Sequence, residues 1–329
     1  MKLDTLLQQA KRELKAISYK AYQEALWILS DSLKLPISQI YLKNNVITKK
    51  QEKDFWLKVD FRKQGMPLEY ILREKFFLNY KFYVEDSVFI PRPETEVLVK
   101  WLFENIPKNK AFKFIDFGTG AGTIILSILD HFVNSLGVAV ELQSKSIKCI
   151  KKNSQNLKLQ NRLYILKKDV CKIENKDLCQ FYLDTLGNNL SYKKINCYNE
   201  NKLYKNSFLK KANSSSKKLN SFLFESSPDL ITANPPYIDP EDKNIQKEVY
   251  LYESPLALFS DKKGLGHIIC WFEKAINLLK PNGIYIFEFG WKQKEQITNF
   301  LDRQKTISSY QILTDQSGHP RIAVCFKKG

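Results

Sequence analysis

The stretch that decides the fold is FKFIDFGTGAGTIILSIL, residues 112–129. Its first six residues, 112–117, are mostly apolar and predict a buried β-strand. A glycine-rich turn follows at 118–122, and the apolar run at 123–129 then predicts a helix. Because glycine lets a backbone turn sharply and approach a ligand closely, this combination indicates the ligand-binding edge of a doubly wound sheet.

The alternation of strand and helix continues toward the C-terminus. Four further runs are typical of strands: 136–141, 162–169, 229–234 and 283–289. A helix around 266–280 precedes the last of them. The late runs at 309–315 and 320–326 leave no room for a helix between them, so they should pair antiparallel. This order predicts an α/β fold, with a mainly parallel sheet and helices on both faces.

The N-terminal quarter of the chain has a different pattern. Apolar side chains recur there at a helical spacing, and Thr48 with Gln51 indicates a capping box at the start of a helix at 49–64. The aromatic stretch FFLNYKFYVED at 76–86 predicts a β-hairpin. We therefore expect three regions: a helical bundle at 1–74, a β-hairpin linker at 75–92 and a sheet-containing domain at 93–329.

One segment interrupts the alternation in the third region. About 60 residues separate Asp169 from Asp229, where a short connection would suffice. Residues at about 172–226 are rich in Lys, Asn and Ser, which predicts a polar, low-complexity insertion that is solvated and largely disordered. A basic arm that touches RNA is the alternative interpretation of this segment.

Composition limits the class of protein. The chain has 329 residues, of which 43% are apolar, and this share is sufficient for a globular core. No apolar run approaches the length of a membrane span, and the N-terminus lacks a secretion signal, so we expect a cytoplasmic protein. The formal net charge of +17 favours an anionic partner such as nucleic acid. A general excess of lysine explains the charge equally well.

The cysteines and histidines show no metal-binding pattern. None of the six cysteines belongs to a C-x-x-C pair, and the three histidines are widely scattered. We therefore expect no metal site and reduced thiols.

The glycine turn predicts the kind of cofactor. Its spacing is G-x-G-x-G, from Gly118, Thr119, Gly120, Ala121 and Gly122. The dinucleotide motif G-x-G-x-x-G instead places a pyrophosphate on the helix N-terminus. The present turn suits a ligand with a ribose and an amino-acid tail but no phosphate, which indicates S-adenosyl-L-methionine. A turn that only connects strand and helix is the alternative.

Three further residues complete the expected cofactor site. Glu141 ends the second strand, 21 residues after Gly120, where an acidic residue holds ribose hydroxyls. Asp169 ends the third strand and should meet the adenine amino group, with Val170 beside the ring.

The stretch ANPPYID, residues 233–239, ends the fourth strand at the same edge and predicts the acceptor. A planar –NH₂ group is a poor nucleophile, because its lone pair is delocalised, and two acceptors that grip its N–H bonds would orient it. The Asn234 side-chain carbonyl and the Pro235 backbone carbonyl can serve as these acceptors. Pro236 restricts the backbone, and Tyr237 can stack on the planar group.

Catalysis at this site would consist mainly of positioning and desolvation, because the nitrogen needs no strong base before methylation. We expect Asn234, Pro235 and Tyr237 to be catalytic, Pro236 to contact the substrate, and Asn234 to border the cofactor as well. A turn or an exposed polyproline ligand is the alternative for this motif taken alone.

In these motifs the chain resembles the release-factor glutamine N5-methyltransferases of the HemK/PrmC type. Six features carry the resemblance: FIPRPETEVLV (89–99), DFGTGAG (116–122), Glu141, ANPPYID (233–239), LYESPLALF (251–259) and FEFGW (287–291). The resemblance implies a class I S-adenosylmethionine-dependent methyltransferase domain with a Rossmann-like seven-stranded sheet at 93–329. It also implies an N-terminal helical bundle that docks the substrate. The implied substrate is the glutamine of the Gly-Gly-Gln motif of peptide-chain release factors, and we expect a monomer.

Several residues depart from the family pattern or leave the substrate open. Glu141 stands where Asp is usual, and Phe117 where a smaller aliphatic residue is common. The NPPY motif also occurs in adenine-N6 and guanine-N2 enzymes, so a nucleic-acid amino methyltransferase is the alternative, and a non-catalytic binding module is a third hypothesis. The stretch IPRPETE favours the release factor. The start of a helix explains the presence of Pro93, Glu94 and Glu96 but not that of Arg92. We expect Arg92 to orient the linker or touch the protein substrate.

Overall fold

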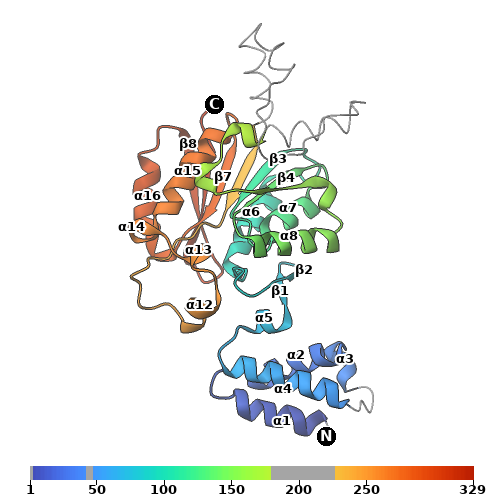
Figure 1. The fold of residues 1–329 in the computed structure, drawn as a ribbon. Helices are drawn as coiled ribbons and strands as arrows, with labels where there is room; N and C mark the ends of the chain where they lie inside the picture. The colour runs from blue at the N-terminus through green and yellow to red at the C-terminus, as the bar shows by residue number, and fades with distance from the viewer. Residues whose placement is uncertain (1–2, 42–46, 179–226) are drawn as a thin grey trace, which may run out of the picture. The chain divides into compact units, whose positions relative to one another are not determined.

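The computed structural model describes residues 3–41, 47–178 and 227–329 (Figure 1). The predicted insertion at about 172–226 therefore lies almost entirely outside the described residues. The chain divides into two compact units. The first comprises Met1–Pro91 with Asp242–Ala257, and the second comprises Arg92–Glu241 with Leu258–Gly329.

Among the described residues, a seven-stranded sheet forms the centre of the second unit. Its strands are β3 (Lys113–Phe117), β4 (Leu136–Glu141), β5 (Leu163–Lys167), β6 (Leu230–Ala233), β7 (Ile284–Glu288), β8 (Ile307–Thr314) and β9 (Pro320–Lys327). Their order is β5-β4-β3-β6-β7-β9-β8. The first five are parallel, and β9 runs antiparallel to both β7 and β8. The predicted α/β class, the parallel core and the antiparallel terminal pair are confirmed.

Helices cover both faces of this sheet (Figure 1). One face carries α6 (Glu96–Asn105), α7 (Thr123–His131) and α8 (Ser144–Asn156), and the other carries α15 (Gly266–Leu278) and α16 (Lys294–Asp302). Short elements connect them: η1 (Pro93–Thr95), η2 (Gln160–Arg162), η3 (Val170–Lys172), α14 (Asp261–Gly264) and η4 (Trp291–Gln293). Alternate strand residues such as Ile115 and Phe117 pack with Phe272 of α15 in a single core, because side chains of a strand alternate between faces.

The register of the parallel strands aligns their carboxyl ends. Phe117 of β3 pairs with Val140 of β4 and with Ala233 of β6, and Ala233 pairs in turn with Phe287 of β7. The residues that follow these strands therefore emerge side by side at one edge of the sheet. This is the edge where ligands of open α/β sheets bind.

The first unit is built from short helices and a hairpin. Its helices are α1 (Leu3–Leu14), α2 (Ala21–Leu33), α3 (Ile37–Ile40), α4 (Lys49–Lys63) and α5 (Leu68–Leu72), followed by β1 (Glu74–Phe77) and β2 (Tyr80–Tyr83). The capping box at Thr48 and Gln51 is present, and β1 pairs antiparallel with β2. The predicted helical pattern and the hairpin are thus confirmed.

A buried apolar core and a few ion pairs hold this helical unit together. Its core includes Leu7, Leu29 and Phe55, which are all fully buried. Arg62 of α4 bonds Glu24 of α2 through Nε at 2.7 Å, with both side chains largely shielded from solvent. The core supplies most of the stability, since burial of an aliphatic or aromatic side chain is worth about 1.5–3 kcal/mol.

Residues Asp242–Ala257 return to the first unit after the NPPYID stretch. They contain α12 (Lys247–Tyr252) and the start of α13 (Pro255–Leu258). The Tyr252 hydroxyl donates to the Gln64 carbonyl at 3.0 Å, and the Glu253 carboxylate accepts from the Ile90 N–H at 3.1 Å. These bonds attach the segment to the helical unit and to the chain that follows the hairpin.

The expectation of reduced thiols is wrong for one pair of cysteines. Cys171 of η3 and Cys270 of α15 form a disulfide with their Cα atoms 6.0 Å apart, although 99 residues separate them in sequence. The α/β fold brings the turn after β5 against α15, and sequence spacing cannot reveal this proximity. Cys149 and Cys325 are buried and belong to no disulfide among the described residues, and Cys179 and Cys197 lie outside the described residues.

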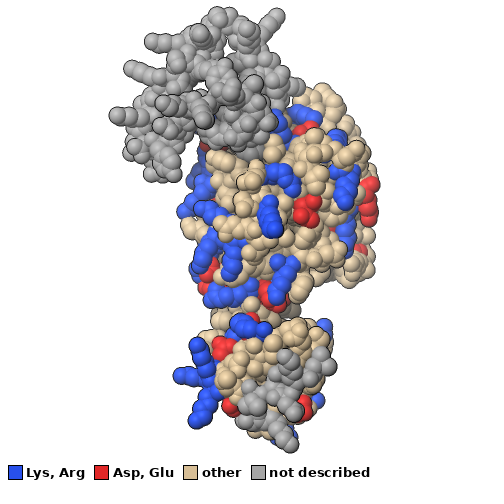
Figure 2. All heavy atoms as spheres, turned by 90° about the vertical axis from the view of Figure 1, so that its right-hand side faces the viewer, with Lys and Arg blue, Asp and Glu red and all other residues tan. Residues whose placement is uncertain are grey.

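Basic side chains are spread over the visible face of each unit, with acidic side chains between them (Figure 2). This distribution agrees with a general excess of Lys and Arg, which number 52 against 35 Asp and Glu. Among the described residues, no helix has the length and apolar character needed to cross a lipid bilayer.

We predict that Leu29→Ala destabilises the helical unit by about 2–5 kcal/mol, because it opens a cavity at a fully buried position of α2. Leu57→Ala on α4 is the matched control, because that leucine is 51% exposed and its truncation should change stability by less than about 0.5 kcal/mol. Chemical denaturation followed by circular dichroism measures both. Equal losses in the two variants would contradict the core assignment.

Candidate active site

The glycine turn after β3 is held in a conformation that only glycine adopts readily. Gly118, Gly120 and Gly122 have φ values of +63°, +60° and +90°. The Gly118 N–H donates to the Val140 carbonyl of β4 at 2.9 Å. A Cβ on Gly118 would overlap the ring of Trp271, so the turn requires glycine there for space as well as for conformation.

The backbone of the turn is also bonded to its neighbours. The Thr119 N–H donates to the Val140 carbonyl at 3.2 Å, and the Ala121 carbonyl accepts from the Asn153 side chain of α8 at 2.8 Å. A Cβ on Gly120 would meet no atom closer than the Gly118 carbonyl at 3.9 Å. The turn is therefore rigid, and it is open on the side of Gly120.

Glu141 connects the end of β4 to this turn. Its Oε2 accepts from the Gly120 N–H and its Oε1 accepts from the Gln143 N–H, both at 2.8 Å. Burial raises the pKa of the Glu141 carboxyl, and the backbone hydrogen bonds oppose that shift. Each carboxylate oxygen has a second lone pair, so Glu141 can hold the turn and still accept hydrogen bonds from two ribose hydroxyls.

Asp116 is a buried carboxyl that the sequence reasoning did not assign to the site. It lies in β3 two residues before the turn, and its Oδ1 accepts from the Thr232 hydroxyl of β6 at 2.7 Å. Its Oδ2 is buried and has no partner among the described residues. Burial raises the pKa of Asp116 to about 7, and the charge of Glu141 adds to the shift. The sequence signal for Asp116 was its position as an acidic residue within an apolar strand, where a charged group is costly to bury.

Asp169 and Val170 lie at the start of η3, just after β5. Asp169 Oδ1 accepts from the Cys171 N–H at 2.9 Å and so starts this short helix. Val170 is 4% exposed and packs in the core of the second unit. Asp169 is partly exposed at the carboxyl edge of the sheet, next to the strand that carries Glu141.

A chain of hydrogen bonds joins the NPPY motif to two other stretches of this sequence. Asn234 follows β6, and its Nδ2 donates to the Thr95 hydroxyl of η1 at 3.2 Å. The Thr95 hydroxyl donates to Glu288 Oε2 at 2.6 Å, and the Tyr237 hydroxyl donates to Glu288 Oε1 at 2.9 Å. Glu288 is the last residue of β7, one position beyond the pairing of Phe287 with Ala233.

Burial dominates the electrostatics of this cluster. Glu288 is fully buried, and desolvation raises its pKa although the bonds from Thr95 and Tyr237 and the charge of Arg321 favour ionisation. Burial and the neighbouring Glu288 raise the pKa of Tyr237 well above its ordinary value, while Arg321 and Arg92 act in the opposite direction. Arg92 therefore lies close enough for its charge to act on the Tyr237 hydroxyl.

The backbone after Tyr237 is clamped by a second set of contacts. The Ile238 N–H donates to the Leu258 carbonyl at 2.9 Å, and the Gln293 side-chain amide donates to the Tyr237 carbonyl at 3.0 Å. Gly264 has φ of +84°, and a Cβ there would overlap the Tyr237 carbonyl oxygen. The NPPY backbone thus has little freedom to move.

Two acceptors remain open at this clamped motif. Pro235 and Pro236 are buried, and Asn234 is partly exposed. Over the ranges that the structure describes, neither Asn234 Oδ1 nor the Pro235 carbonyl oxygen accepts a hydrogen bond. Both atoms can therefore accept the two N–H bonds of a planar amino group.

Besides Asp116, three side chains of this site were not among the residues expected from the sequence: Thr95, Glu288 and Gln293. The signals were present for two of them. Thr95 lies in the stretch IPRPETE together with Arg92 and Pro93, and Glu288 is a single acid within the apolar strand IYIFE. No local signal identifies Gln293, which reaches the Tyr237 carbonyl across 56 residues.

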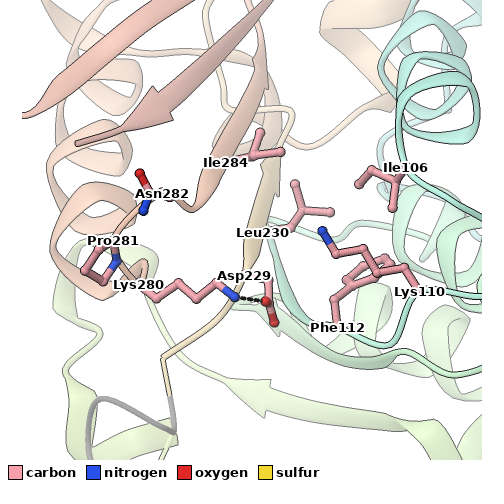
Figure 3. Close-up of a pocket in the computed structure, with 9 residues that line it drawn as sticks. All are labelled: Ile106, Lys110, Phe112, Asp229, Leu230, Lys280, Pro281, Asn282 and Ile284. Atoms are coloured by element: carbon pink, nitrogen blue, oxygen red, sulfur yellow. Dashed lines mark hydrogen bonds and ion pairs between the residues drawn. The ribbon is translucent and has the colours of Figure 1, made fainter. Parts of the chain in front are cut away.

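A pocket of about 350 Å³ lies at the opposite edge, at the amino ends of β3, β6 and β7 (Figure 3). Its lining is Ile106, Lys110, Phe112, Asp229, Leu230, Lys280, Pro281, Asn282 and Ile284. Asp229 pairs with Lys280 and also accepts from the Lys113 N–H at 2.8 Å. These polar groups bond to one another at the amino ends of the strands. The pocket shares no residue with the candidate active site.

Known proteins resemble this chain over most of its length. Residues 5–72 match the family model described as "PrmC N-terminal domain". A "Release factor glutamine methyltransferase" of Mycoplasma mycoides is 30% identical over 88% of this chain and 81% of its own. A protein of that name from Francisella tularensis is 30% identical over 87% and 84%, and one from Clostridium acetobutylicum is 28% identical over 94% and 93%.

We predict that Gly264→Ala costs roughly 1–3 kcal/mol more stability than Gly318→Ala. Both glycines have positive φ, at +84° and +81°, so both variants carry the same backbone strain. Only Gly264 has a neighbour, the Tyr237 carbonyl, whereas no atom lies within 4 Å of a Cβ on Gly318. Thermal and chemical denaturation measure the difference, and equal losses would show that the Tyr237 backbone is not clamped.

We predict that Asp116→Asn flattens the dependence of stability on pH. The folded pKa of Asp116, about 7, lies above its unfolded value, so the folded state keeps a proton that the unfolded state releases. Stability of the native protein should therefore fall as pH rises from about 4 to 7, and this contribution disappears in the variant. Melting temperatures across this range measure it, with Asp130→Asn at an exposed position of α7 as the control for charge. Parallel curves for the native protein and Asp116→Asn would contradict the assignment.

Proposed function

The chain belongs to the release factor glutamine methyltransferase family, and from this premise we propose that it methylates N5 of the glutamine in the Gly-Gly-Gln motif of peptide-chain release factors. Its second unit is a methyltransferase fold, and the proposed methyl donor is S-adenosyl-L-methionine. The observation that carries the proposal is the pair of open acceptors, Asn234 Oδ1 and the Pro235 carbonyl, next to the glycine turn at one sheet edge.

The residues at the carboxyl edge fit this cofactor. Glu141 can accept from the ribose hydroxyls, and the open side of the turn at Gly120 leaves room for a close approach of the ligand. We propose Gly118, Thr119, Gly120, Ala121, Gly122, Glu141, Asp169, Val170 and Asn234 as the cofactor-binding residues. When bound, the cofactor supplies an electrophilic methyl group.

The acceptor residues orient the glutamine amide. Asn234 Oδ1 and the Pro235 carbonyl each accept one N–H of the –NH₂ group, which holds its plane and the direction of its nitrogen lone pair. Pro235 and Pro236 keep this backbone stiff, because each ring fixes its own φ. The Tyr237 ring is held by its hydroxyl bond to Glu288, so it can present a fixed surface to the planar amide.

The identity of the substrate rests on more than the NPPY motif. The helical unit provides a candidate docking surface for a protein substrate, and the family model matched at residues 5–72 supports a role specific to this family. Arg92 lies near Tyr237, and we propose that its charge helps to position the substrate loop.

The decisive experiment is methyl transfer from radiolabelled S-adenosyl-L-methionine to a purified release factor. We expect label in the native release factor and none when the glutamine of its Gly-Gly-Gln motif is replaced by alanine. Label that persists in the alanine variant would overturn the assignment. Label that appears in added RNA or DNA, and disappears on nuclease treatment, would instead favour a nucleic-acid amino methyltransferase, for which the net charge of +17 is the supporting observation.

Asn234→Ala should lower kcat for release-factor methylation by about 100-fold or more, because the substrate amide loses one of its two orienting acceptors. Cofactor affinity, measured by calorimetry, should fall by no more than a few-fold, because the glycine turn and Glu141 remain in place. Asn299→Ala on exposed α16 is the matched control and should leave both quantities unchanged. Native kcat in Asn234→Ala would rule out the proposed grip on the amide.

A further inference from the structure

We propose that Thr95 and Glu288 are positioning residues that fix which end of the Asn234 side-chain amide faces the substrate. This inference deepens the proposed function and rests on it for its effect on turnover. It concerns the hydrogen-bond chain from Asn234 through Thr95 to Glu288, with Tyr237 as a second donor to the same carboxylate.

The polarity of this chain follows from the number of protons that each group carries. A threonine hydroxyl has one proton, and the ionised Glu288 carboxylate, which is favoured by the bonds from Thr95 and Tyr237 and by the charge of Arg321, can only accept. Thr95 must therefore give its proton to Glu288, at an oxygen separation of 2.6 Å. Its lone pairs are then left for Asn234, so the group of Asn234 that faces Thr95 at 3.2 Å must be the donor, Nδ2. Oδ1 then has to point away from Thr95.

The orientation matters because the two ends of an asparagine amide have nearly the same shape and opposite hydrogen-bonding character. With Oδ1 outward, Asn234 accepts from the substrate –NH₂ group. After a half-turn about the Cβ–Cγ bond, Nδ2 would face that group, and two donors would repel each other. The hydroxyl of Thr95 therefore favours the Asn234 orientation that accepts from the substrate over the flipped orientation, which has a similar shape but cannot accept.

Burial makes the carboxylate a fixed reference for this orientation. Glu288 is 0% exposed and Thr95 is 3% exposed, so water does not compete for their bonds. Both oxygens of Glu288 are occupied, one by Thr95 and the other by Tyr237. Thr95 and Glu288 come from η1 and β7, so three separate stretches of sequence meet at one side-chain amide.

The first test compares Thr95→Val with Thr95→Ser. Valine keeps the shape of threonine but removes the hydroxyl, and we expect kcat for release-factor methylation to fall roughly 10- to 100-fold with little change in cofactor affinity or in KM for the release factor. Serine keeps the hydroxyl and should restore kcat to within about threefold of the native value. Thr298→Val on α16, whose hydroxyl bonds only the Glu295 carbonyl, is the matched control.

The second test reads the orientation without relying on activity. In an NMR spectrum, the Asn234 side-chain NH₂ resonances are assigned by their loss in Asn234→Ala. We expect one Nδ2 proton to exchange slowly with solvent in the native protein and in Thr95→Ser, and rapidly in Thr95→Val. Fast exchange in the native protein would overturn the inference even if the release factor is methylated. Slow exchange without methylation would overturn the proposed function and leave the orientation intact.

The third test asks whether Glu288 acts through Thr95. In the native protein the hydroxyls of Thr95 and Tyr237 both donate to the Glu288 carboxylate. Glu288→Gln replaces one accepting oxygen with an N–H donor, so one of these hydroxyls can no longer donate there. The orientation of the hydrogen-bond chain is then no longer fixed, and kcat should fall. In the Thr95→Val background the same change should add little, giving a non-additive cycle. Additive losses, or native kcat in Glu288→Gln, would overturn the role of Glu288. Melting temperatures within a few degrees of the native value confirm that the variants are folded.

Discussion

The in-register parallel pairing of β3 with β4 and β6 is the constraint on which the rest of the structure depends. Phe117 pairs with both Val140 and Ala233, so the glycine turn, Glu141 and Asn234 leave the sheet at the same level. A change of register by one residue would send each following side chain to the other face of the sheet. Backbone hydrogen bonds of the sheet thus set the spacing between cofactor residues and acceptor residues.

Burial of charge is the second condition that shapes this edge. Asp116, Glu141 and Glu288 are all buried, and desolvation raises the pKa of each carboxyl. Their partners are mainly hydroxyls and backbone N–H groups, with the charge of Arg321 acting on Glu288 as well. Hydrogen bonds of this kind have fixed directions, so they orient neighbouring groups as well as stabilise the charge. These three carboxyls are costly to bury, but their hydrogen bonds fix the positions of the groups around them.

Much of the fold and part of the site followed from local patterns. The strands were predictable because apolar runs of five to eight residues are bounded by turn residues, and the glycine turn because positive φ favours glycine. Asn234 and Glu141 were predictable as strand ends. Thr95 and Glu288 carried local signals, but their roles were not predictable, because these roles depend on one another across 193 residues. The Cys171–Cys270 disulfide escaped for the same reason, since its two halves lie 99 residues apart.

The sequence by itself determined the alternation of strands and helices, the position of the glycine turn and the chemical type of the acceptor at NPPY. Each of these depends on residues that are neighbours in the chain, where spacing and backbone preference act directly. Only the tertiary structure decided which way the Asn234 amide faces and that Asp242–Ala257 packs with the helical unit. It also decided which glycines cannot be replaced because a neighbouring side chain, such as Trp271, fills the space of a Cβ. These features arise from contacts between distant segments, and they exist only once the sheet has aligned its strand ends.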